Sequence, residues 1–165
     1  MNRIISAVLT ASALIFGVFL PSEEAVAQTT AKDLVGTWTL VSAITEKDAT
    51  KSDTFGPYAS GVLVFDASGL YTLTIIGDLP RVASNNRGTA TPEEAKGIVS
   101  GSIAHFGTYT VSDKIITFNV QRSTFANWTT TDLKRPLVLT GDQLVYRVEA
   151  ASAGGTAAVT WERGK

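Results

Sequence analysis

Short runs of threonine, valine, isoleucine and aromatic residues, separated by turn-forming residues, dominate the chain from residue 34 onward. Apolar and polar positions alternate within several of these runs, which is typical of strands with one buried face and one solvated face. The pattern predicts eight strands, at residues 38–43, 61–65, 70–76, 106–111, 114–121, 135–139, 143–149 and 157–163. Because nearly all the connections are short, we expect an up-and-down antiparallel sheet.

The turns between neighbouring strands support this topology. Asp66–Gly69 connects two strands and places glycine where a positive φ is needed, Ser112–Asp113 connects the next hairpin, and Gly141–Asp142 suits a two-residue type II′ turn. These three connections predict three β-hairpins.

One segment, from Gly77 to Ile103, interrupts the series of strands. Thr91, Pro92 and Glu94 form the signature of a helix start, with a capping residue, proline in the first turn and a capping box. Apolar residues follow at helical spacing and predict one apolar face: Ala95, Ile98, Val99 and Ile103. We therefore expect a short helix between strands 3 and 4, packed against the sheet and over one mouth of it.

The first 27 residues have the pattern of a secretory signal peptide. Arg3 is followed by an apolar run over residues 4–20, then by Pro21 and an Ala25–Ala27 cleavage site before Gln28. The run is shorter than the ~20 residues of a membrane-spanning helix, so an uncleaved anchor is the weaker alternative. The predicted organisation is a signal peptide at 1–27 and one domain at 28–165, in a periplasmic or secreted protein.

Composition narrows the classes of partner. The chain has no cysteine, so it has neither disulfides nor a lipidation site after the cleavage position. Without residues 1–27, 13 basic residues balance 13 acidic ones, and no basic cluster indicates nucleic acid or an anionic membrane. We expect no nucleic-acid partner and no stable membrane anchor after cleavage; the oligomeric state is open.

Eight antiparallel strands in a domain of this length form either a closed barrel or a sandwich. Closure removes exposed sheet edges, and an eight-stranded barrel has room for side chains and one small ligand. In a barrel the first and last strands meet, so Trp38 plugs the floor with Arg163 stacked on its indole. Gly36 lets the chain cross closely beneath. These three residues are expected to be structural.

Seven segments occur in the order typical of the bacterial lipocalin-like domain family, which this chain resembles from Leu34 to Arg163. They are LVGTWTLVS (34–42), GPYASGVLVFDASG (56–69), TPEE (91–94), FGTYTV (106–111), FANW (125–128), LTGDQL (139–144) and TWER (160–163). The resemblance implies an all-β, lipocalin-type barrel. Members often read Thr-His-His-Val-Glu on the fifth strand, whereas this chain reads TFNVQ at 117–121. Any chemistry carried by those histidines is therefore expected to be absent.

Residues able to carry chemistry are few. His105 is the one histidine and no ligand set surrounds it in the sequence, so no catalytic residue, metal site or cofactor is predicted. Glu93 and Glu94 are explained by the favourable electrostatics of a helix start.

The barrel interior remains as the candidate site. Ten residues are predicted to line it or to lie over its mouth: Phe65, Tyr71, Arg81, His105, Tyr109, Phe118, Gln121, Trp128, Arg135 and Tyr146. Alternation does not decide which face is inside. In the strand at 114–121, Ile116, Phe118 and Val120 share one face, and Thr117, Asn119 and Gln121 share the other. If the apolar face points inward, the pocket is dry. If the polar face points inward, the pocket holds water.

Three functions fit this sequence. The first is an exported binder of a small apolar or amphipathic molecule, marked by a cavity of roughly 300 Å³ or more with few polar groups. The second is a barrel enzyme of isomerase or cyclase type acting on a lipid-like substrate, which requires a titratable group with a shifted pKa in the cavity. The third is a ligand-free barrel that acts through its surface, marked by a filled interior and an exposed apolar patch. We favour the first.

Overall fold

The computed structural model describes residues 28–164, and the predicted signal peptide at 1–27 lies outside the described residues. Two α-helices, α1 (Ala31–Leu34) and α2 (Pro92–Ser100), and two 3₁₀ helices, η1 (Arg87–Thr89) and η2 (Ala126–Trp128), accompany the strands. The strands are β1 (Gly36–Lys47), β2 (Thr50–Asp53), β3 (Ser60–Phe65), β4 (Leu70–Ile76), β5 (Ser102–Ser112), β6 (Ile115–Ser123), β7 (Asp132–Thr140), β8 (Gln143–Val148) and β9 (Thr156–Arg163).

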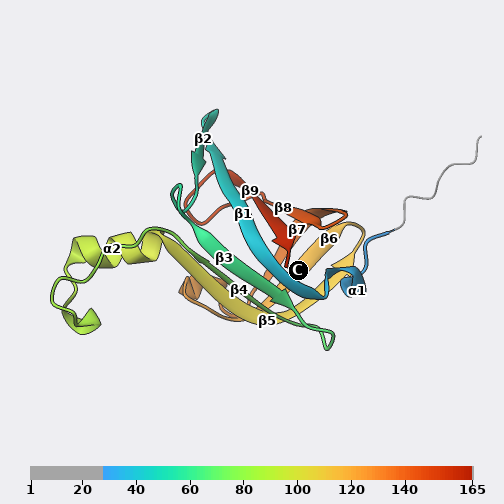
Figure 1. Cartoon of the computed structure of the whole chain (residues 1–165), viewed down its shortest axis with the longest axis horizontal. Coiled ribbons are helices and arrows are strands. Elements are labelled where there is room, and N and C mark those ends of the chain that lie inside the picture. Colours follow the sequence, from blue (N-terminus) through green and yellow to red (C-terminus); the bar gives the residue numbers. More distant parts are fainter. Residues whose placement is uncertain (1–27, 165) are drawn as a thin grey trace, which may run out of the picture.

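Eight of these strands form a closed antiparallel barrel (Figure 1). The ring runs from β1 through β3 to β9 in sequence order and closes where β9 pairs with β1, from Trp38 opposite Arg163 to Glu46 opposite Thr156. Strand β2 pairs only with the last residues of β1, from Ile44 to Lys47, and lies outside the ring. The predicted eight-stranded barrel is confirmed, and the sandwich is excluded.

In the numbering of the structure α2 follows β4 and not a third strand, because the unpredicted β2 shifts the count by one; the helix still lies between the strands expected at 70–76 and 106–111. Strand β2 was missed, since its four exposed residues carry no apolar alternation. Ile103 was assigned to the helix, but α2 ends at Ser100 and Ile103 belongs to β5, with its side chain buried inside the barrel.

The apolar face of each strand points inward. Ile116, Phe118 and Val120 of β6 are buried, whereas Gln121 is exposed. On β1 a bulge between Leu40 and Ser42 shifts the register. The buried positions therefore change from the even-numbered Trp38 before the bulge to the odd-numbered Ala43 after it.

A plug closes one end of the barrel. Helix α1 places Leu34 against the core, and the Trp38 indole donates a 2.8 Å hydrogen bond from Nε1 to the Leu34 carbonyl oxygen. The expected contact with Arg163 is present, because its guanidinium carbon lies 4.2 Å from the centre of the indole. The same guanidinium donates to the carbonyl oxygens of Val35 and Asp33 at 2.9 and 2.7 Å. Arg163 therefore connects the last strand to α1 and to the plug.

The closed end also carries the tight turns. Gly69 has a φ of +89° in the predicted turn at 66–69, and Gly141 has a φ of +57° in the turn from β7 to β8. The turn from β5 to β6 is one residue later than predicted, with positive φ at Asp113 and Lys114. Gly36, at the start of β1, has a φ of +135°, and a Cβ there would lie 3.3 Å from an Arg163 nitrogen. Only glycine fits this crossing without strain.

The longer connections gather at the opposite end, because the strands alternate in direction. They are the segments at 54–59, 77–101, 124–131 and 149–155. Residues near loops of this kind, held by a rigid barrel, are the usual place for binding sites. We call this end the open end.

Helix α2 was expected to lie over a mouth of the barrel, but most of it does not. In Figure 1 it projects with its preceding loop beyond the ends of β4 and β5, away from α1. A hydrogen bond from Gly77 N to Gly101 O joins the two ends of this connection between β4 and β5. The helix packs on its own loop, with Pro80 against Gly97 and Glu94 accepting from Ala83 N. Its side chains therefore have no place in the barrel core.

Candidate functional site

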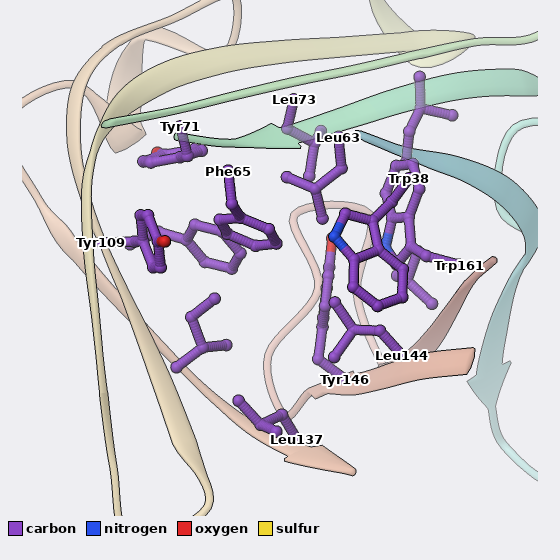
Figure 2. Close-up of a cluster of buried hydrophobic side chains, with 14 of the residues drawn as sticks. Trp38, Leu63, Phe65, Tyr71, Leu73, Tyr109, Leu137, Leu144, Tyr146 and Trp161 are labelled. Carbon is purple, nitrogen blue, oxygen red and sulfur yellow. The ribbon is translucent and has the colours of Figure 1, made fainter. Parts of the chain in front are cut away.

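The barrel interior is filled at the closed end. Trp38 and Trp161 lie together on neighbouring strands, and Phe65, Tyr71 and Tyr109 form a second aromatic group (Figure 2). The Tyr109 hydroxyl donates to carbonyl oxygens at the floor, with Ala31 at 3.2 Å and Asp66 at 3.3 Å. This half of the barrel is occupied by the buried core cluster.

A small cavity of about 70 Å³ remains above this core. Aliphatic side chains from most of the strands form much of its wall, together with the rings of Phe118, Trp128 and Tyr146. Two basic side chains also face it, those of His105 and Arg135. This inner cavity has room for a few water molecules or a small chemical group, but not for a whole drug-sized ligand.

A wider cavity of about 370 Å³ lies at the open end. Its walls come from the segment after β2, the last turn of α2, η2 and the connection from β8 to β9. The two cavities share six lining residues: Thr54, Phe55, Ile103, Trp128, Ala151 and Ser152. Because they share these walls, we treat them as one funnel, with an outer cavity that leads into the inner one.

The polar groups of the inner cavity form a connected set. The Tyr71 hydroxyl lies 2.9 Å from His105 Nδ1, and both side chains are buried. Burial lowers the pKa of His105 to about 4, and the nearby positive charge of Arg135 acts in the same direction. Burial also raises the pKa of Tyr71 and of Tyr146. At neutral pH the imidazole and both phenols are therefore uncharged.

Arg135 is the basic residue of the inner cavity that stays charged. It projects from β7 opposite the buried Ile116 of β6, so the register of the two strands directs it inward. Burial lowers its pKa, which the neighbouring Tyr146 and Glu149 partly offset. Because an arginine pKa starts at 12.5 or above, the guanidinium remains protonated.

Five of the ten predicted ligand-binding residues line the inner cavity: His105, Phe118, Trp128, Arg135 and Tyr146. Tyr71 lies directly behind them, bonded to His105. Phe65 and Tyr109 belong to the core near the plug, where their ring centres are 4.6 Å apart. The structure therefore brings these eight residues together inside the barrel.

The other two predicted residues lie elsewhere. Arg81 is exposed in the loop between β4 and α2, and it lines neither part of the funnel. Gln121 is on the outer surface of the barrel, because its neighbour Val120 takes the inward position of β6. Their expected position toward the interior or over the mouth is therefore wrong.

Several lining residues were missed by sequence reasoning. Phe55, Phe125, Ala151 and Ser152 come from connections, where no alternation indicates a facing direction. Ala43 and Ala157 leave open space in the inner cavity because their side chains are short. For these two alanines, a small residue on a predicted inward face is the signal in the sequence that could have indicated the cavity.

Within the part of the chain that the structure describes, no three His, Cys, Asp or Glu side chains come together as a metal site. In the same part no helix has the length and apolar character required to cross a bilayer. The residues that line the funnel combine apolar side chains with the Tyr146 phenol, a neutral imidazole, one guanidinium, and serine and threonine hydroxyls near the mouth.

Comparison with known proteins gives one result at the family level. No curated protein matches the chain. The lipocalin-like domain pattern matches residues 35–164, from the residue before β1 to the residue after β9. This match covers every barrel strand and both parts of the funnel. The chain belongs to the lipocalin-like domain family.

Proposed function

We propose that this protein binds a small apolar or amphipathic molecule, which enters the barrel through the open end. The observation that carries this proposal is the funnel, whose outer part of about 370 Å³ leads to an inner part of about 70 Å³. The inner cavity alone is smaller than a typical pocket for a small molecule, whereas the volume of the outer cavity falls in the usual range for such pockets. A modest ligand would therefore place one end in the barrel and its body in the outer cavity.

The exposed apolar residues of the mouth support this proposal. Val99, in the last turn of α2, lines the outer cavity but is 72% exposed. Phe125 and Trp128 also line this cavity, with their ring centres 5.5 Å apart. An apolar ligand body would cover such surfaces and gain the free energy of removing them from water.

A titration of the delipidated mature chain tests the proposal, with fluorescent fatty acids, retinoids and polyaromatic dyes as ligands. Val99→Ser should weaken binding about three- to tenfold, because part of a valine side chain no longer contributes apolar contact. Val138→Ser is the matched control, since Val138 is 61% exposed on β7 and lines neither cavity. Absence of saturable binding across the panel would contradict the proposal and favour a barrel that acts through its surface.

A second candidate is a barrel enzyme of isomerase or cyclase type. The observation that favours it is His105, a buried histidine with a lowered pKa that faces the cavity beside Arg135. A neutral imidazole and a cation directed at one carbonyl oxygen can stabilise developing negative charge. Product analysis after incubation with the bound molecule separates the two functions, because turnover abolished by His105→Phe would establish the enzyme.

We further propose that the protein is exported, with the mature chain starting at Gln28 in the periplasm or outside the cell. The support is the arrangement of a basic start, an apolar run and an Ala-Val-Ala cleavage site in residues 1–27. N-terminal sequencing of protein recovered from the exported fraction should give Gln28. A sequence starting at Met1, or recovery in the membrane pellet, would contradict cleavage.

A further inference from the structure

We infer that the polar end of the ligand is a carboxylate, which Arg135 and His105 Nε2–H bind together in the inner cavity. This inference rests on the proposed ligand-binding function and adds the chemical class of the ligand.

The first step is the unpaired charge of Arg135. A guanidinium has five N–H donors. The one hydrogen bond that the Arg135 guanidinium makes to the described residues runs from Nη1 to the carbonyl oxygen of the neighbouring Lys134, at 3.0 Å. No carboxylate of residues 28–164 lies within 4.0 Å of it, although Glu149 is near enough to act electrostatically. A partly buried cation without an ion pair is costly, and an anionic ligand would compensate that cost.

The second step is the direction of the proton on His105. The buried Tyr71 hydroxyl keeps its proton because its pKa is raised, and the partner that the structure gives it among the described residues is His105 Nδ1, at 2.9 Å. If Nδ1 carried the hydrogen and donated it to Tyr71, the buried hydroxyl proton would have no acceptor, which is unfavourable. Nδ1 therefore accepts from the hydroxyl. The neutral ring therefore carries its hydrogen on Nε2, which bonds to no other described residue.

The third step is the position of these donors. His105 and Arg135 line the inner cavity and not the outer one, whereas the outer cavity is walled by Phe55, Ile98 and Phe125 among others. The groups that face His105 from other elements are Tyr71 of β4, Arg135 of β7, and the rings of Phe118 and Trp128. None of these is an anion. A planar carboxylate suits the guanidinium fork, and its apolar chain would extend toward the mouth.

A matched pair of ligands tests this inference: decanoic acid and decan-1-ol, titrated at pH 7.5 into the delipidated mature chain by calorimetry. The wild-type protein should bind decanoate at least about tenfold more tightly than decanol, because a charge-assisted pair is lost with the alcohol. Arg135→Met should remove this preference and keep decanol binding. Arg147→Met is the control, since Arg147 lies exposed on β8 and should leave the preference unchanged.

The histidine provides an independent readout, because the chain contains a single one. In ¹⁵N spectra of the imidazole, decanoate should shift the Nε2 signal and raise the pKa of His105, and Arg135→Met should abolish that response. Equal affinity for decanoate and decanol, or a preference that survives in Arg135→Met, would overturn the carboxylate assignment while the proposed binding function stands. Absence of binding by both ligands would overturn both.

Discussion

The plug at the closed end should be the most sensitive point of the fold, and Trp38→Ala is the perturbation that tests this. Trp38 has no exposed surface, contacts Arg163 above its ring and bonds to Leu34 O at 2.8 Å. Truncation of a buried tryptophan costs about 3–5 kcal/mol through lost transfer energy and the cavity left behind. The lost hydrogen bond leaves Leu34 O without its indole partner, which moves the cost toward the upper part of this range.

Arg163→Met should cost less, about 1–2 kcal/mol. It removes the hydrogen bonds to Val35 O and Asp33 O, while the ion pair with Asp142 is exposed and contributes little. A double-mutant cycle between Trp38→Phe and Arg163→Met should give a coupling of about 0.5–1 kcal/mol, the usual size of a cation–π contact near the surface.

Urea denaturation of the mature chain, followed by circular dichroism, measures these differences as shifts of the transition midpoint at constant slope. Trp128→Ala is a comparison variant, because Trp128 lies at the open end and is only half-buried. A loss below about 1 kcal/mol for Trp38→Ala, or no coupling to Arg163, would refute the structural role of the plug.

Two further predictions concern the interior. The pKa of His105 is lowered to about 4, below its ordinary value of 6.5. As the pH is lowered below 6.5, the unfolded chain therefore takes up a proton that the folded chain does not. The free energy of unfolding should fall by up to about 1.4 kcal/mol for each pH unit from pH 6.5 down to pH 4. Denaturation at several pH values should show that His105→Gln has a smaller slope in this window; an unchanged slope would contradict the assignment. Gly107→Ala should lose about 1–3 kcal/mol, because a Cβ at Gly107 would meet the carbonyl oxygen of Asn119 at the bulge between β5 and β6. Gly88→Ala, in the exposed 3₁₀ helix η1, should change stability by less than about 1 kcal/mol in the same assay.

The barrel could be predicted because its information is local. Strand alternation, the glycines at the tight turns and the Trp38–Arg163 contact follow from short stretches of sequence together with closure of the sheet. The elements that sequence reasoning missed are three or four residues long, which is too short for a periodic pattern: α1, β2, η1 and η2. The conformation of α1 and β2 depends on the barrel that they contact.

The site was harder to predict for two physical reasons. Threonine occurs on both faces of several strands, so alternation alone did not separate the inward Arg135 from the outward Gln121. Eleven of the 24 residues that line the funnel come from the connections, whose direction is set by the strands they join. The pairing of Tyr71 with His105 is a contact between residues 34 positions apart, and it became visible only with the register of β4 and β5.

Fluorine NMR of the mature chain labelled with 5-fluorotryptophan tests ligand binding in the funnel most directly. The chain contains three tryptophans: Trp128 lines both parts of the funnel, while Trp38 and Trp161 lie in the core at the closed end. Titration with decanoate should shift the Trp128 signal in a saturable way and leave the Trp38 signal in place. An unchanged Trp128 signal at saturating ligand would contradict binding inside the barrel.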